Sequence, residues 1–100
     1  MTQPTNEGLL CLSAQRAFLG RIHPEMRLIK VKFAGSRIRL TVILGSPPNF
    51  KVSEHISEAA SEIIADFPEV QKVEEFVEII PGALPKGDLI EEGWIYKSAE

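Results

Sequence analysis

Apolar side chains recur at helical spacing in two stretches of the chain. In the first stretch, four of them would share one face of a helix: Leu10, Ala14, Ala17 and Phe18. Gly20 suits the left-handed conformation that often follows a helix, so we expect this helix to end there. In the second stretch, six apolar residues repeat every three or four positions: Ile56, Ala59, Ala60, Ile63, Ile64 and Phe67. Ser53 is the predicted N-cap of the second helix, and Pro68 ends it.

A change from helical spacing to strict alternation predicts a β-hairpin between the two helices. Apolar and basic residues alternate on both sides of Gly35-Ser36. For both apolar sets to share one face, Phe33 must pair with Ile38. Val31 then faces Leu40, and Gly35-Ser36 is left as the loop of the hairpin. Glycine in the first loop position is what a type II′ turn requires.

Two further strands are predicted towards the C-terminus. Residues 73–80 are rich in β-branched side chains, and their imperfect alternation indicates a bulge or partial burial of both faces. Trp94-Ile95-Tyr96 is typical of a short strand at a sheet edge, and the stretch before it, up to Gly93, is expected to be loop. The order α-β-β-α-β-(β) favours an α+β fold, a two-layer α/β sandwich with a mainly antiparallel sheet and both helices on one face. We expect a single domain over residues 1–100, with residues 1–6 frayed.

The charge of the chain is unevenly distributed. Residues 1–45 carry seven basic and two acidic side chains, whereas residues 46–100 carry four basic and twelve acidic ones, so the net charge of −3 conceals two opposite halves. Cys11 is the single cysteine, which excludes an internal disulfide and fits a reducing compartment. The N-terminus has no signal-peptide pattern and no apolar run could span a bilayer, so we predict a cytoplasmic protein without a membrane partner.

The second helix carries four carboxylates at i,i+4 spacing, which we call the acidic row: Glu54, Glu58, Glu62 and Asp66. Neighbours of like charge at this spacing cost roughly 0.2–0.5 kcal/mol per pair in an isolated helix. No Lys or Arg lies between Lys51 and Lys72, so we expect the row to stay unneutralised within the fold. Its role could be a solvated outer face or an anionic docking surface that three strand carboxylates extend. Those three residues are Glu74, Glu75 and Glu78.

The predicted hairpin presents basic side chains on the face opposite its apolar one: Lys30, Lys32, Arg37 and Arg39. Lys32 would lie opposite Arg39, which is unfavourable unless an acid intervenes. Glu74 or Glu78 of the next strand could supply that acid. Nucleic-acid binding is the alternative, but exposed aromatic residues for stacking are missing and the overall charge is negative. We therefore expect a salt-bridged sheet surface and no nucleic-acid partner.

The sequence predicts neither an active site nor a metal site. His23 and His55 are the only histidines and belong to different elements, so we expect ordinary surface histidines, because a zinc site needs about three protein ligands. Cys11 could form a hydrolase dyad with a histidine, but a buried structural thiol is commoner on an amphipathic helix. No glycine-rich phosphate loop, GxSxG, HExxH or CxxC motif occurs. We expect no cofactor and no enzymatic activity.

Three segments taken together resemble a known family: RAFLGRIHPEMR at 16–27, ASEIIADFP at 60–68 and GWIYK at 93–97. In this order and spacing the chain resembles small acidic bacterial immunity proteins of polymorphic toxin systems, including those of contact-dependent growth inhibition. The resemblance implies a non-catalytic protein that binds a cognate toxin domain and blocks its active site or a substrate-binding surface. The basic hairpin departs from the family pattern.

For a nuclease toxin, the resemblance implies that carboxylates would occupy the basic groove in place of phosphates. The candidate contacts are the acidic row and the three strand carboxylates. The alternative function is a small homo-oligomeric structural or regulatory domain, in which the basic hairpin of one copy meets the acidic face of another. We expect a monomer or weak homodimer when the protein is free.

Overall fold

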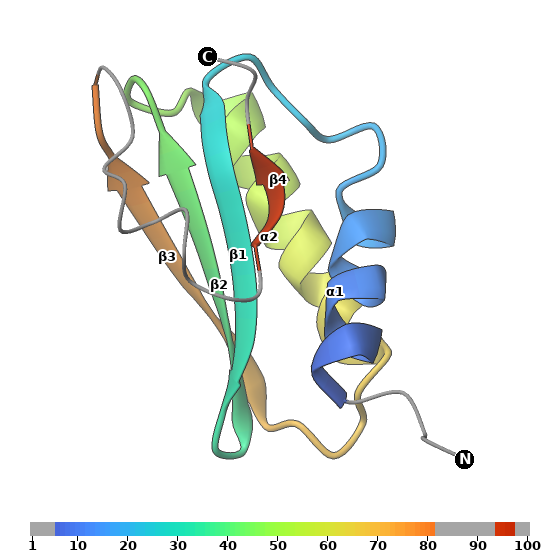
Figure 1. Cartoon of the computed structure of the whole chain (residues 1–100). Helices are drawn as coiled ribbons and strands as arrows, with labels where there is room; N and C mark the ends of the chain where they lie inside the picture. The colour runs from blue at the N-terminus through green and yellow to red at the C-terminus, as the bar shows by residue number, and fades with distance from the viewer. Residues whose placement is uncertain (1–5, 82–93, 98–100) are drawn as a thin grey trace.

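A computed structural model describes residues 6–81 and 94–97 of the chain. The elements follow the predicted order: α1 (Asn6–Ala17), β1 (Met26–Ala34), β2 (Arg37–Leu44), α2 (Phe50–Ala65), β3 (Lys72–Ile79) and β4 (Trp94–Lys97). Both helices lie on one face of the sheet (Figure 1), which confirms the predicted two-layer α/β sandwich. Residues 1–5, which belong to the segment predicted to be frayed, lie outside the described part. The loop predicted up to Gly93 also lies outside it, over residues 82–93.

The sheet has the strand order β3-β2-β1-β4. β1 is antiparallel to both β2 and β4, whereas β2 and β3 run parallel. The parallel pair follows from α2, which leaves the end of β2 and returns the chain to the start of β3 (Figure 1). The sheet is therefore mainly antiparallel, as predicted, with one parallel edge.

The predicted hairpin register is confirmed. Phe33 pairs with Ile38 and Val31 with Leu40, and the loop is Gly35-Ser36. Gly35 has a φ of +63°, while no residue other than glycine has a positive φ in the described part. A positive φ at the first loop position alone is the signature of a type II′ turn.

The core lies between the helices and the sheet. The predicted apolar face of α1 is buried in full, and on α2 all six predicted positions are buried except Ile64, which is half-buried. Phe67, which follows α2, meets Phe33 of β1 edge to face, with ring centroids 5.5 Å apart. Burial of each large apolar side chain contributes about 1.5–3 kcal/mol before the entropic cost of ordering it.

The predicted N-cap of α2 is wrong by one helical turn. Asn49, not Ser53, caps the helix: its side-chain oxygen accepts a hydrogen bond from the Val52 N–H at 2.9 Å. Asn is at least as good an N-cap as Ser, and the earlier start allows Val52 to extend the buried face of the helix.

β3 is an edge strand of the sheet formed by the described residues. Its pairing with β2 continues from Lys72 to Ile79 without a bulge. Val77 and Ile79 share the register of buried β2 residues yet are exposed. The imperfect alternation in the sequence thus reflects a strand that is incompletely covered.

Candidate functional site

The acidic row does not follow the outer face of α2. An i,i+4 row is inclined by about 26° to the helix axis, so successive carboxylates turn from solvent towards α1. Glu54, at the start of the row, has no ion pair within the described residues. Asp66, at its end, accepts a hydrogen bond from the buried hydroxyl of Ser13 in α1, at 2.6 Å. The row therefore begins in solvent and ends at the contact between the helices.

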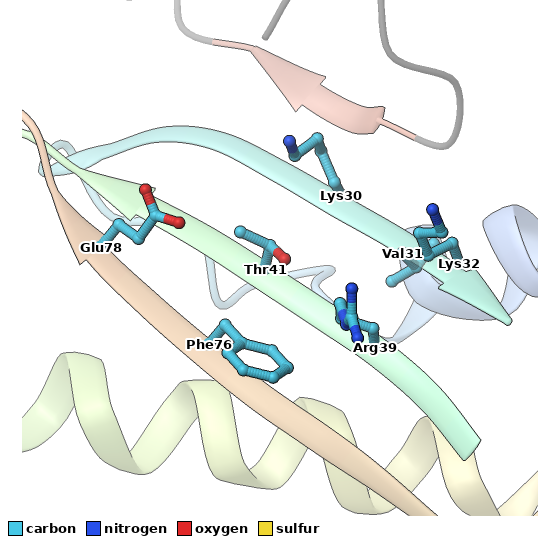
Figure 2. A pocket seen from close by; sticks show the side chains of 7 residues that line it. All are labelled: Lys30, Val31, Lys32, Arg39, Thr41, Phe76 and Glu78. Carbon is cyan, nitrogen blue, oxygen red and sulfur yellow. The ribbon is translucent and has the colours of Figure 1, made fainter. Parts of the chain in front are cut away.

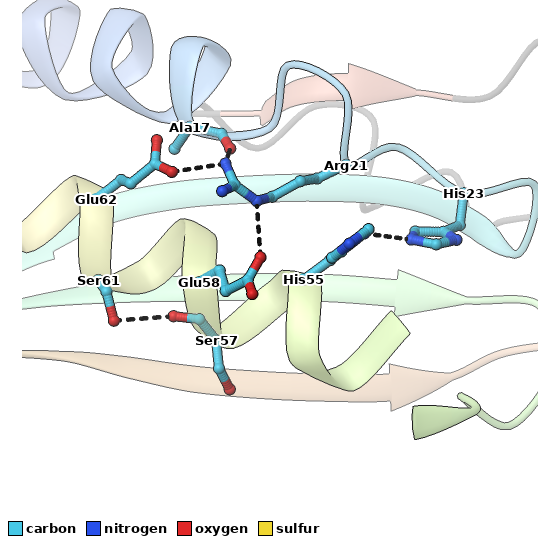
Figure 3. Close-up of polar contacts among 8 residues, drawn as sticks. All are labelled: Ala17, Arg21, His23, His55, Ser57, Glu58, Ser61 and Glu62. Atoms are coloured by element: carbon cyan, nitrogen blue, oxygen red, sulfur yellow. Dashed lines mark hydrogen bonds and ion pairs between the residues drawn. The ribbon is translucent and has the colours of Figure 1, made fainter. Parts of the chain in front are cut away.

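Arg21 neutralises the middle of the acidic row. It follows α1, and its guanidinium lies 3.3 Å from a carboxylate oxygen of Glu58 and 2.7 Å from one of Glu62 (Figure 3). The same guanidinium donates a hydrogen bond to the Ala17 carbonyl at 2.7 Å. Farther along the row, Arg16 of α1 lies 3.4 Å from Asp66. The expectation that the row stays unneutralised is wrong, because the compensating arginines come from the N-terminal half of the chain.

The arrangement of these ion pairs leaves the carboxylates facing outwards. The Arg21 side chain is 23% exposed, whereas those of Glu58 and Glu62 are 47% and 50% exposed. One guanidinium thus lies closer to the protein interior than the two carboxylates that it binds, and it fixes their position. The surface seen by an approaching molecule is richer in carboxylate than in guanidinium.

The three strand carboxylates do not extend the acidic row as a set. Successive residues of a strand point to opposite faces, and Glu75 shares the register of the buried Leu40 on the helix side. There it accepts a hydrogen bond from the Ser57 hydroxyl of α2, at 3.1 Å. Glu74 and Glu78 belong to the opposite face of the sheet, which we call the open face. The predicted single acidic surface is therefore divided between two faces.

The open face carries the basic residues of the hairpin together with part of β3. Glu74 forms ion pairs with Arg37 at 3.3 Å and Lys72 at 4.0 Å, so β3 does supply an acid to the hairpin, but not to the Lys32–Arg39 pair for which it was predicted. Arg39 instead lies over the ring of Phe76, 5.2 Å from its centroid. Phe76 is 42% exposed, so the expectation that this face lacks an exposed aromatic residue is wrong.

Residues of β1, β2 and β3 line a hollow of about 400 Å³ on the open face (Figure 2). The lining residues are Lys30, Val31, Lys32, Arg39, Thr41, Phe76 and Glu78. Lys32 pairs directly with Arg39 across the hairpin, as the predicted register required. The hollow is therefore basic, with one carboxylate and one aromatic ring at its border.

His23 and His55 are not independent surface histidines. Their rings approach so that Nε2 of His23 and Nδ1 of His55 lie 2.8 Å apart (Figure 3). His23 belongs to the loop between α1 and β1, and His55 to α2. No spacing in the sequence reveals this contact, because the two residues lie in separate elements that only the packing of the loop on α2 brings together.

The described residues contain no group of three or more His, Cys, Asp or Glu that could hold a metal ion. Cys11, the candidate thiol, is half-buried on α1. No helix in the described part is long and apolar enough to cross a membrane.

The described residues form a small α+β domain with an acidic row on α2 and a basic hollow on the open face of the sheet. The MafI2 immunity protein family matches residues 7–100. Because the match covers nearly all of the chain, the protein belongs to this family. The predicted resemblance to bacterial toxin immunity proteins is thereby confirmed, and the family implies a cognate toxin as the protein partner. No curated protein matches the chain.

Proposed function

We propose that this protein binds a cognate toxin domain in the cytoplasm, in a stoichiometric and non-catalytic complex, through the acidic surface of α2. The family supplies the toxin as partner. The observation that carries the choice of surface is the position of Glu58 and Glu62, half-exposed above the less exposed Arg21. Four members of the row and the adjacent Glu75 form this surface.

The proposed partner surface is basic, as in the substrate groove of a nuclease. Carboxylates held in place would occupy the positions of substrate phosphates and exclude the substrate. Because Arg21 restrains two of them before binding, less conformational entropy is lost in the complex. Carboxylates at the rim would raise the association rate, and a fully desolvated pair would slow dissociation. Glu74 and Glu78 would contribute only where the toxin reaches around β3 to the open face.

Glu54 offers the cleanest test of this surface, because its replacement breaks no ion pair in the described structure. The toxin domain encoded beside the gene should form a tight complex with the wild-type protein. Glu54→Lys should slow association and flatten its dependence on salt. The matched control is Glu69→Lys, a reversal at an exposed residue after α2. Equal association rates for the two variants would show that α2 is not part of the interface.

The alternative is a homo-oligomer in which the acidic row of one copy meets the open face of another. The observation in its favour is that surfaces of opposite charge lie on opposite faces of the same molecule. Such a head-to-tail contact would be sensitive to salt, and the assembly that it forms would grow as the protein concentration rises. Sedimentation at low salt tests it, and a strict monomer at high concentration would contradict it.

A further inference from the structure

Two cations of the open face lie directly opposite each other with no acid to separate them. Lys32 and Arg39 are register partners in the β1–β2 ladder, where directly opposed Cβ atoms are about 4.5–5.5 Å apart. Neither forms an ion pair with any residue in 6–81 or 94–97. The fold therefore contains a repulsion between like charges that a bound anion would relieve.

The β3 carboxylate in register with Arg39 is directed elsewhere. Glu74 is the register partner of Arg39, but its carboxylate is held by Arg37 and Lys72. Arg39 meets the face of Phe76 instead. A ring face attracts the guanidinium but neutralises no charge, so the full positive charge of Arg39 remains at the border of the hollow.

The hollow of the open face is large enough to receive side chains from another molecule. Its volume of about 400 Å³ lies within the range of ligand sites, about 300–1,000 Å³. Two cations at this separation suit a carboxylate, which accepts a hydrogen bond on each oxygen. The hydroxyl of Thr41 and the partly exposed ring of Phe76 add one polar and one apolar group at the same place (Figure 2).

The same hollow is poorly suited to a nucleic acid. The guanidinium of Arg39 lies over one face of the Phe76 ring, so that face is not available for stacking a base. Glu78 lines the hollow as well and would repel a continuous phosphate backbone. A protein segment can place one carboxylate between Lys32 and Arg39 and keep its other charges away from Glu78.

We propose that the open face, centred on Lys32 and Arg39, binds an acidic segment of the toxin, with one carboxylate seated between the two cations. This inference rests on the proposed function, which supplies the toxin as partner. It adds a second contact of opposite charge on the opposite side of the immunity protein. A toxin that engages both faces must present a basic surface to α2 and an acidic segment to β1 and β2.

The first experiment uses a short blocked peptide of alternating glutamate and threonine, titrated into the ¹⁵N-labelled protein at low ionic strength. Amide shifts confined to the strands around Lys32, Arg39 and Phe76 would support the site. The glutamine–threonine peptide of equal length should give no such shifts. Lys32→Gln and Arg39→Gln should each weaken binding by about tenfold, the effect of losing one charge-assisted hydrogen bond. Lys51→Gln, at an exposed residue of α2, is the matched control and should bind normally.

Two results would overturn the inference: no selective shifts with the acidic peptide, or tighter binding of a single-stranded DNA oligonucleotide to the same residues. The second experiment measures dissociation of the complex with the toxin domain encoded beside the gene. Dissociation should be about tenfold faster for Lys32→Gln than for Lys51→Gln. If the wild-type complex forms and both variants dissociate equally, the second contact is refuted while the proposed function stands. If no wild-type complex forms, the proposed function fails, and the peptide alone decides whether this face binds carboxylates.

Discussion

Arg21 and Glu62 approach to 2.7 Å and connect the segment after α1 to the middle of α2. The same guanidinium reaches Glu58 and the last carbonyl of α1, so a single side chain satisfies three acceptors. It also separates two carboxylates that would otherwise repel each other.

Arg21→Ala should lower the free energy of unfolding by about 1–2 kcal/mol, the range for loss of partly buried, charge-assisted hydrogen bonds. Urea denaturation followed by circular dichroism measures the change. Arg16→Ala is the matched control: Arg16 is 71% exposed, and removal of such an exposed pair should change stability by less than about 0.5 kcal/mol. Equal losses in the two variants would show that the Arg21 contacts are no stronger than an exposed pair.

The N-cap of α2 gives a second prediction with an internal control. Asn49→Ala removes the acceptor for the Val52 N–H and should cost about 1 kcal/mol. Ser53→Ala should cost much less, because Ser53 is an exposed residue within the helix. Thermal or chemical denaturation compares the two variants directly. A larger loss for Ser53→Ala would place the start of the helix at the later position.

The repulsion between Lys32 and Arg39 predicts a stabilising substitution. Lys32→Thr removes one of the opposed charges and introduces a residue favoured in strands, so stability should rise by about 0.2–1 kcal/mol. Lys51→Gln is the control, because it removes one exposed charge outside the sheet. Urea denaturation at low salt measures both. A loss of stability in Lys32→Thr would mean that its charge is compensated after all.

The contact between His23 and His55 connects the loop after α1 to α2. His23→Ala removes this hydrogen bond and should lower the free energy of unfolding by about 0.5–1.5 kcal/mol, the range for one hydrogen bond.

A double-mutant cycle isolates this contact. In urea denaturation, His23→Ala and His55→Ala together should cost less than the sum of the two single changes, because each single variant already loses the shared hydrogen bond. Additive losses would refute a role for the pair.

Local patterns were sufficient to predict the helices and the hairpin, since helical spacing and alternation report which face is buried. The Gly35-Ser36 turn and the apolar pattern required the same register, and the structure has that register. The start of α2 was missed because Asn49 and Ser53 are both good N-caps, and the choice depends on burial of Val52.

The candidate surfaces were harder to predict because their partners are distant in sequence. The acidic row has no basic residue nearby in the chain, yet Arg16 and Arg21 reach it through the packing of α1 on α2. Glu74 and Glu75 are adjacent in sequence but face opposite sides of the sheet. Which side of a strand faces a helix was uncertain here because the alternation of residues 73–80 was imperfect.

The edge strand β3 has a further consequence for how the protein behaves in solution. Its exposed Phe76, Val77 and Ile79 would make an uncharged edge prone to joining the sheet of another molecule. Three glutamates are interspersed with them, and two β3 strands brought side by side would set these charges against each other. The carboxylates of β3 thus act against intermolecular sheet growth and aggregation.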